Sequence, residues 1–383
     1  MKVVFISNYL SHHQLPFCLE MQRRLKENFC FIATERISEE RLALGYSDMN
    51  SMYDFVLCTY EGEQQEREAK ALSLEADVVI WGSAPKKYIR ERLKKNKLTF
   101  LYSERIYKSG YQAWKRPVHM LKLHWKFGRY KNLHLLCSSA YAAADYAKTH
   151  TFIEKTYKWG YFPETKQYND IDQLVADKKP GTILWVGRFI ELKHPEQVLE
   201  VAQRLKADGY NFSVKMVGCG VMEEQLHQMA EEMDLEKDVC FTGSMSPEEV
   251  RTSMEESEIY LFTSDRNEGW GAVLNESMNS GCAVVASHMI GAVPFLVEDG
   301  VNGLIYTSGD VDDLYRKVKK LMDEPDTRKA MGLQAYQTMT QSWSAQTAAD
   351  RVMKLSEALL NGNKHPDLFK SGPCSKAPVL KDE

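Results

Sequence analysis

Short apolar, β-branched runs alternate with amphipathic stretches along almost the whole chain. In the first half these runs cover 3–6, 29–33, 77–81, 98–102 and 133–138, and in the second half 182–186, 212–217, 239–242, 258–263 and 283–287. Segments with helical periodicity lie between them, for instance 194–207, 221–234 and 310–322. This alternation predicts an α/β fold in which helices cover parallel sheets.

The alternation is interrupted once, near residues 160–181, by a polar stretch that predicts a linker. A chain of 383 residues also exceeds what one ordinary core supports. We therefore expect two Rossmann-like domains facing each other across a cleft, over residues 1–162 and 163–342. We expect a helix at 343–360 to return to the first domain. Residues 361–383, rich in Pro, Lys, Ser and Gly, are predicted to form a flexible tail.

Composition indicates a globular protein, because 44% of the residues are hydrophobic and 27% are charged. The four apolar residues at 3–6 are too few for a secretory signal, and no apolar run approaches the roughly 18 residues that span a bilayer. None of the eight cysteines forms a C-x-x-C pair, which favours buried thiols. These features predict a cytoplasmic protein.

Charge is distributed unevenly along the chain. Residues 1–160 contain 26 Lys and Arg against 17 Asp and Glu, whereas the rest contains 23 against 36. The basic residues gather at 86–97 and 114–131, where Trp and Phe are interleaved in the second segment. This pattern predicts contact with an anionic membrane surface at the inner face or with a phosphorylated acceptor. A core-packed helix with a solvated basic face is the alternative, and no motif indicates nucleic-acid binding.

Functional residues are expected directly after the strands, because ligands of open α/β sheets bind beyond the carboxyl ends of the strands. The strand at 182–186 is followed by Gly187 and Arg188, and Lys193 opens the next helix. Two cations near a helix N-terminus can hold a diphosphate and stabilise its departure. The alternative is that both cations are solvated surface residues.

Two further strands end in small residues. Gly218-Cys219-Gly220 forms a turn that would admit a nucleotide, and the segment Gly243-Ser244-Met245 can line a base pocket. Ser246 and Glu249 have the spacing of a capping box, which predicts a structural role for Ser246.

The most informative segment runs from Asn267 to Glu276. Two glycines flank an aromatic residue immediately before a predicted helix, and a carboxylate follows within it. That carboxylate can accept two hydrogen bonds from the diol of a ribose, and N–H groups at 271–273 can bind phosphate. The residues of this segment expected at the ligand are Glu268, Gly269, Trp270, Gly271, Ala272, Val273 and Glu276.

Together these motifs, over roughly residues 180–325, resemble glycosyltransferase family 4, a group of retaining enzymes with the GT-B fold. Glu268 and Glu276 match its E-x₇-E signature, and Gly187, Arg188 and Lys193 match G-R-x-x-x-x-K. The segment 299–304, Asp-Gly-Val-Asn-Gly-Leu, follows in the expected order. The resemblance implies that Arg188 and Lys193 hold the donor diphosphate and Glu276 the ribose. Glu268 would contact the transferred sugar, while 243–245 would border the base.

The chain departs from the family pattern in two places. The first strand is followed by residues 7–13, Ser-Asn-Tyr-Leu-Ser-His-His, instead of a glycine-rich turn, and Phe295 replaces an expected glutamate. Asn8, His12 and His13 are therefore candidates for the acceptor side, although adjacent histidines can also be plain loop residues. Glu104 takes the place of the histidine that the family puts after a middle strand. It is a candidate polar contact to sugar or acceptor, unless it pairs with Arg105.

No metal or other cofactor is expected. Asp310 and Asp312 resemble a metal-binding D-x-D motif, but Asp310 stands where an N-cap of the helix after it is expected. Asp170 and Asp172 fall in the predicted linker and are expected to be solvated.

The sequence thus predicts a metal-independent, retaining glycosyltransferase that uses a nucleotide-diphosphate sugar, with UDP-sugar favoured by the resemblance. The acceptor is expected to be a glycan or lipid-linked saccharide in cell-surface polysaccharide synthesis. An epimerase or phosphorylase of the same fold, or a non-catalytic subunit that binds sugar nucleotides, remains the alternative.

Overall fold

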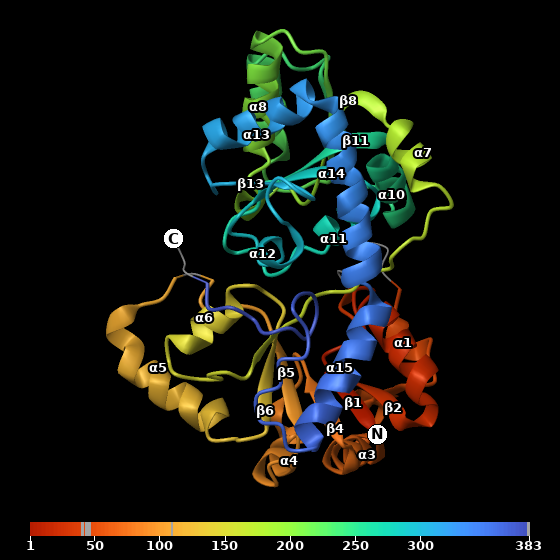
Figure 1. Cartoon of the computed structure of the whole chain (residues 1–383), viewed down its shortest axis with the longest axis vertical. Helices are drawn as coiled ribbons and strands as arrows, with labels where there is room; N and C mark the ends of the chain where they lie inside the picture. The colour runs from red at the N-terminus through yellow and green to blue at the C-terminus, as the bar shows by residue number, and fades with distance from the viewer. Residues whose placement is uncertain (40–41, 43–46, 109, 381–383) are drawn as a thin grey trace. The chain divides into compact units, whose positions relative to one another are not determined.

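The computed structural model describes residues 1–39, 42, 47–108 and 110–380, and the chain divides into two compact units (Figure 1). Unit 1 comprises Met1–Glu164 and Ser344–Glu383, and unit 2 comprises Thr165–Trp343. Each unit contains one sheet whose strands are all parallel. The predicted fold class, α/β with two Rossmann-like domains, is therefore confirmed.

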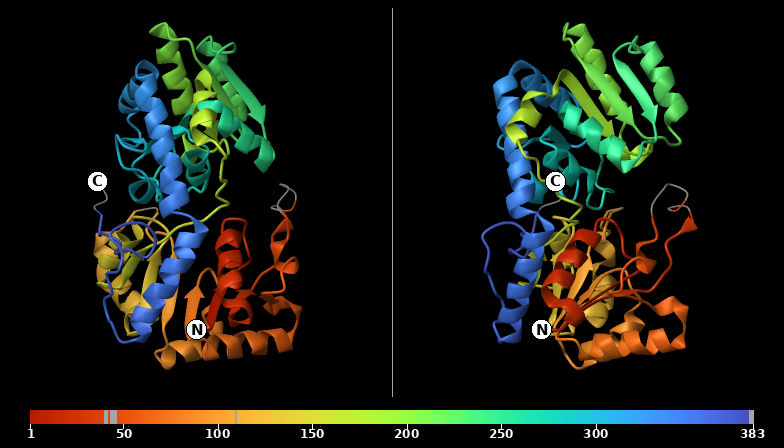
Figure 2. Two further views of the ribbon diagram at one scale, coloured as in Figure 1. Left: turned by 45° about the vertical axis from the view of Figure 1, so that its right-hand side comes forward. Right: turned by 90° about the vertical axis from the view of Figure 1, so that its right-hand side faces the viewer.

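Unit 1 has a seven-stranded sheet in the order β3-β2-β1-β4-β5-β6-β7. Its strands are β1 (Val3–Ser7), β2 (Phe29–Ala33), β3 (Val56–Cys58), β4 (Val78–Trp81), β5 (Thr99–Ser103), β6 (Leu133–Cys137) and β7 (Thr156–Lys158). Its α-helices include α1 (Leu15–Leu25), α3 (Glu63–Glu75), α4 (Arg90–Lys94), α5 (Arg116–Leu123), α6 (Ala142–Ala147) and α15 (Ala345–Leu360). Helix α15 lies beside α1, although more than 300 residues separate them in the sequence (Figures 1 and 2).

Unit 2 has a six-stranded sheet in the order β10-β9-β8-β11-β12-β13. Its strands are β8 (Lys179–Val186), β9 (Ser213–Val217), β10 (Val239–Gly243), β11 (Ser257–Phe262), β12 (Ala283–Ser287) and β13 (Leu304–Tyr306). Its helices are α7 (Ile171–Ala176), α8 (Glu196–Ala207), α9 (Glu223–Glu232), α10 (Pro247–Glu256), α11 (Val273–Asn279), α12 (Val293–Leu296), α13 (Val311–Asp323) and α14 (Pro325–Gln337).

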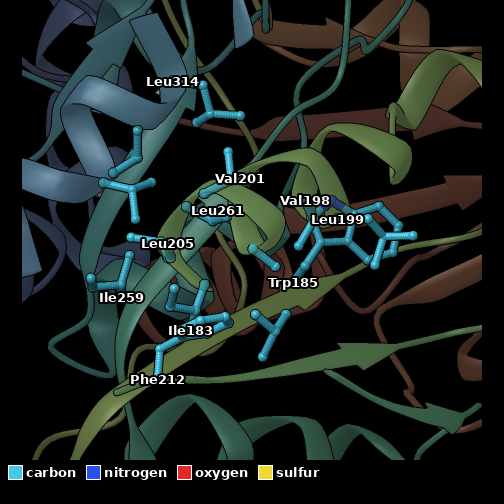
Figure 3. Packing of buried hydrophobic residues seen from close by; sticks show 14 of the residues in the cluster. Ile183, Trp185, Val198, Leu199, Val201, Leu205, Phe212, Ile259, Leu261 and Leu314 are labelled. Atoms are coloured by element: carbon cyan, nitrogen blue, oxygen red, sulfur yellow. The ribbon is translucent and has the colours of Figure 1, made fainter. Parts of the chain in front are cut away.

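The core of unit 2 forms where α8 packs on the central strands. Val198, Val201 and Leu205 repeat at helical spacing on one face of α8 and are buried. They meet alternate side chains of the sheet, among them Ile183 and Ile259, as Figure 3 shows. Each fully buried side chain of this kind contributes roughly 1.5–3 kcal/mol relative to an exposed one. This packing fixes β8 and β11, the strands whose ends carry the candidate donor site.

The predicted flexible tail is wrong for residues 374–377. Cys374 N–H donates to the Lys158 carbonyl (2.8 Å), and Lys158 N–H donates to the Ser375 carbonyl (2.8 Å). Tyr157 and Lys376 form an antiparallel bridge, and Cys374 is buried. The tail pairs here because β7 is an edge strand, which would otherwise expose unpaired backbone groups.

The predicted linker at 160–181 is also partly wrong, because α7 and the start of β8 lie inside it. Asp170 is the N-cap of α7, and its Oδ1 accepts from Gln173 N–H (2.8 Å). The Asp170 carboxylate is exposed, as the sequence predicted, and it has a capping role in addition.

The strand order of both sheets reverses once, between β1 and β4 in unit 1 and between β8 and β11 in unit 2. Ligands of open α/β sheets bind beside such a switch point, beyond the carboxyl ends of the strands. Each unit therefore has one position where a substrate is expected.

Candidate functional site

At the switch point of unit 2, Lys193 and Glu268 form an ion pair across 75 residues of sequence. Lys193 ends the 3₁₀ turn Glu191–Lys193 after β8, and Glu268 lies in the loop after β11. Their side chains are 15% and 14% exposed. The structure thus brings together two of the predicted catalytic residues and leaves both reachable from solvent.

Neighbouring hydrogen bonds fix this pair in place. Ser264 Oγ donates to Glu268 Oε2 (3.1 Å), and Thr263 Oγ1 donates to the Lys193 carbonyl (2.6 Å). The indole N–H of Trp185 in turn donates to Thr263 Oγ1 (2.9 Å). Because Trp185 belongs to the core, the position of the cation is coupled to the packing of the sheet.

Arg188 follows β8 directly, as the sequence predicted, and its side chain is exposed. Within the described residues its guanidinium forms no ion pair, so its donors are available to an anion. The adjacent Gly187 faces the Trp185 ring, and a Cβ there would lie 2.9 Å from that ring.

The glycines that follow β8 and β9 come together with Gly243, the last residue of β10, at the carboxyl ends of these strands. Gly218 N–H donates to the Gly243 carbonyl (2.8 Å), and Gly187 N–H donates to the Val217 carbonyl (3.0 Å). Gly218 has φ +135°, and a Cβ there would lie 1.9 Å from the Gly187 carbonyl oxygen. Close approach of the turns accounts for this glycine without any ligand.

Ser244 and Met245 follow at the same edge. Ser244 Oγ lies 3.2 Å from Cys219 Sγ, and both side chains are exposed. Met245 Sδ accepts from Ser253 Oγ at 3.9 Å, which holds it against α10. The predicted capping box of Ser246 and Glu249 at the start of α10 is confirmed.

Trp270 requires a correction, because its side chain belongs to the core. It is 1% exposed, and its indole N–H donates to Asn275 Oδ1 (2.9 Å). The ring packs against Phe295 and Trp343, with centroids 6.4 and 5.9 Å away. Phe295 thus completes an aromatic cluster, and Trp270 has only its backbone to offer a ligand.

The glycines beside Trp270 allow the loop to turn tightly into α11. Gly269 is buried, and Gly271 has φ +85° with a Cβ position only 2.4 Å from the Phe262 ring. Ala272 is the N-cap residue of α11 and Val273 its first residue. These residues shape the backbone of the loop that carries Glu268.

Glu276 lies half-buried on α11. Burial raises the pKa of its carboxyl, and Arg251 opposes this effect. The Arg251 guanidinium donates to the Glu276 carbonyl (3.2 Å), to Asn279 Oδ1 (3.1 Å) and to Ser280 Oγ (3.2 Å). The desolvated carboxylate of Glu276 would therefore gain from hydroxyl donors of a ligand.

At the switch point of unit 1 there is a cavity of about 830 Å³. Residues that follow β1, β4 and β5 line it, and so do residues of α5 and of the π-helical segment His124–Gly128 after α5. Polar side chains of the wall include those of Asn8, His13, Ser83, Glu104, Lys122 and Lys126.

Glu104 is held in the wall of this cavity by two donors. Tyr161 O–H donates to Oε1 (2.7 Å), and Lys108 Nζ donates to Oε2 (2.7 Å). The alternative pairing with Arg105 is wrong, because the Arg105 side chain is fully buried and pairs with Asp145 at 3.3 Å. Glu104 is thus placed where it can contact a ligand of the cavity.

Asn8 and His13 line the cavity, and His12 lies against His13 with ring centroids 3.7 Å apart. The His13 ring also stacks on Tyr161 at 5.4 Å, and Asn8 Oδ1 accepts from Ser7 Oγ (3.1 Å). The sequence reasoning missed Ser83 and Tyr161. The strand-end rule, applied to the residues after β4, would have found Ser83.

The two aspartates of the D-x-D pattern already have partners. Asp310 caps α13, with Oδ1 accepting from Asp313 N–H (2.9 Å), which confirms the predicted N-cap. Asp312 forms an ion pair with Arg204.

The two basic segments differ in structure. In 86–97, Arg92 is buried and donates to four backbone carbonyls, so Arg92 itself is not available to a membrane surface. Lys87 and Lys94 pair with Glu66 and Glu91.

The segment 114–131 exposes apolar side chains along one helical face. Trp114, Val118, Leu121 and Trp125 are 77%, 68%, 63% and 59% exposed, at spacings of four, three and four residues. Lys115 and Arg129 lie over the rings of Trp114 and Trp125. Helix α5 lies at the outer margin of unit 1 (Figure 1). Among the described residues, no helix combines the length and the hydropathy that crossing a bilayer requires.

The two parallel-sheet units define the GT-B architecture of glycosyltransferases. Residues 166–338 match the family "Glycosyl transferases group 1", and unit 2 belongs to that family.

Individual known proteins are similar over different lengths. A D-inositol 3-phosphate glycosyltransferase of Corynebacterium aurimucosum is 28% identical over 170 residues, which cover 43% of this chain and 40% of that protein. The amylovoran biosynthesis glycosyltransferase AmsK of Erwinia amylovora is 33% identical over 141 residues, covering 36% and 34%. The chain thus spans less than half the length of these curated relatives. The structure of Anabaena Alr3699/HepE in complex with UDP shares the fold, with a TM-score of 0.67, 16% identity, and coverage of 94% of this chain and 100% of that one.

Proposed function

We propose that this chain is a retaining glycosyltransferase that transfers a sugar from a nucleotide-diphosphate donor to a glycan or lipid-linked saccharide. The observation that carries this proposal is the Lys193–Glu268 pair at the switch point of unit 2, in the same loop after β8 that carries the exposed Arg188. A diphosphate gains negative charge as the sugar leaves, and fixed cations stabilise that charge. Glu268 holds the Lys193 ammonium in position and can also contact the sugar.

Unit 2 would hold the donor, with Glu276 accepting hydrogen bonds from the ribose and residues 243–245 bordering the base. UDP is favoured as the nucleotide, because the Anabaena protein of the same fold contains it. The cavity of unit 1 would hold the acceptor, with Glu104 or His13 near the reacting hydroxyl. The amylovoran relative supports a role in polysaccharide synthesis.

Incubation of the pure chain with UDP-, GDP- and ADP-sugars tests this proposal. We expect one donor to raise the apparent melting temperature and to be turned over with release of the nucleotide, because a ligand of the folded state stabilises it. An epimerase would convert the donor without releasing nucleotide, and a non-catalytic subunit would bind without turnover. Absence of both binding and release for all three classes would refute the proposal.

We also expect activity to survive EDTA, since Asp310 and Asp312 are committed to a helix cap and to Arg204. Nucleotide release should remain within about twofold after chelation. Loss of activity that Mn²⁺ or Mg²⁺ restores would contradict this expectation.

The exposed face of 114–131 supports reversible contact with an anionic membrane, where aromatic side chains enter the interface and each nearby cation contributes about 1 kcal/mol. Replacing Trp114 and Trp125 by serine should lower the fraction bound to anionic vesicles at least fivefold in sedimentation. Val221, 90% exposed in unit 2, offers a matched control as Val221→Ser. Binding should weaken as salt rises. Equal sedimentation of all variants would contradict membrane contact through this face.

A further inference from the structure

The helical segment that borders the unit 1 cavity carries cations on its cavity side. Leu123 and Phe127 are buried beneath it, while Lys122 and Lys126, one helical turn apart, lie at the cavity rim. This side differs from the outward face that exposes Trp114 and Trp125. The same segment therefore presents two surfaces of different chemistry.

No acid neutralises this rim. Within the described residues, neither Lys122 nor Lys126 forms an ion pair with a carboxylate. Lys86 adds a third cation nearby, with its Nζ donating to the Lys126 carbonyl (2.9 Å) and lying over the Tyr130 ring. Like charges at this spacing repel, and burial together with Lys122 and Lys86 lowers the pKa of Lys126.

Among the described residues that line the cavity, Glu104 is the one acid, and Tyr161 and Lys108 already donate to it. On the same helix as Lys122, His119 Nδ1 lies 3.2 Å from Tyr107 Oη, and the two rings stack. The cavity thus combines cations at its rim with hydroxyl and imidazole groups in its wall. Such an arrangement is suited to an anion with several oxygen atoms.

We propose that Lys122 and Lys126 form a phosphate subsite, so that the acceptor bound in this cavity bears a phosphate or diphosphate group. The inference rests on the proposed function, because it assigns the acceptor class of the same enzyme. The phosphate can belong to a lipid or to a soluble sugar phosphate. In both cases the rim cations bind its oxygens and direct the attached sugar toward Glu104.

The test measures pyrophosphate binding to the full chain by calorimetry with the proposed donor site saturated by UDP, because that site would also bind a diphosphate. UDP binding is measured in parallel. The double variant Lys122→Gln/Lys126→Gln should raise the Kd for pyrophosphate at least tenfold and leave that for UDP unchanged. Lys122→Arg/Lys126→Arg should retain binding. Lys94→Gln/Lys95→Gln, at the C-terminal end of α4 and outside the cavity, is the control with the same loss of charge. Arg188→Ala should weaken UDP binding and leave the rim subsite intact.

Unchanged pyrophosphate affinity in the glutamine variant, or an equal loss in the α4 control, would overturn the subsite. If UDP does not bind while the glutamine variant still loses pyrophosphate affinity, the result counts against the proposed donor and not against the subsite. Vesicles containing phosphatidic acid, compared with neutral vesicles, distinguish the two sources of phosphate. If the glutamine variant loses binding only to the phosphatidic acid vesicles, the phosphate belongs to a lipid. If it loses binding only to pyrophosphate, the phosphate belongs to a soluble molecule.

Discussion

Replacing Lys193 by methionine should lower kcat/KM for the sugar donor by roughly 100- to 1,000-fold. The ammonium group is held by Glu268 at the switch point of unit 2, and removal of one preorganised donor to a developing anion costs about 2.7–4 kcal/mol. Methionine keeps the length and the apolar stem of the side chain, and it removes the ammonium, which also lies over the Phe262 ring. Steady-state kinetics measures this change in kcat/KM, with the sugar donor that the nucleotide-release assay has identified.

A double-mutant cycle with Glu268→Gln tests whether the two residues act as one unit. If Glu268 serves mainly to orient Lys193, the double variant should be little worse than Lys193→Met alone. Additive losses would mean that Glu268 contacts the sugar independently. Lys179→Met, in the exposed Lys179–Glu256 pair of the same unit, is the control and should retain near-native activity. Near-native turnover of Lys193→Met would contradict the donor site.

Much of the sheet architecture could be predicted because parallel, buried strands are continuous apolar runs. The strands β3, β7 and β13 were missed, since each has only three residues, which is too short for a clear pattern. The order of the strands followed only from the structure, yet the rule that ligands bind after strand ends had already selected Gly187 and Glu268.

The site was predicted least well where the same residue type can either contact a ligand or solvent, or be buried in the core. Trp270 has the setting of a ligand contact, but its indole completes a cluster with Trp343, a partner 73 residues later that no local pattern indicates. Arg92 resembles its solvated neighbours in the sequence and is nonetheless buried against backbone carbonyls. Glu104 was selected by position, whereas its partner Tyr161 lies 57 residues away. Such pairings depend on tertiary packing, which periodicity does not encode.

Asp145 provides the second large expected effect, because it anchors the loop that carries Glu104 and Tyr107. Its side chain is fully buried on α6, and its Oδ2 accepts from Ile106 N–H (3.0 Å) and Tyr107 N–H (2.9 Å). Its Oδ1 lies 3.3 Å from the buried Arg105 guanidinium. One carboxylate thus satisfies the backbone of the loop and compensates the charge of a buried cation.

Asp145→Ala should lower the free energy of unfolding of unit 1 by about 3–5 kcal/mol, because it leaves the Arg105 charge buried without its carboxylate. Asp350→Ala, which removes a partly exposed carboxylate on α15 of the same unit, should cost about 1 kcal/mol or less. Urea unfolding followed by fluorescence measures both values. Since the anchored loop lines the cavity, Asp145→Asn should weaken pyrophosphate binding even where the unit stays folded, because an amide supplies one acceptor oxygen instead of two. A loss below about 1 kcal/mol for Asp145→Ala, equal to that of the control, would show that water or another group replaces the carboxylate and that the loop does not depend on it.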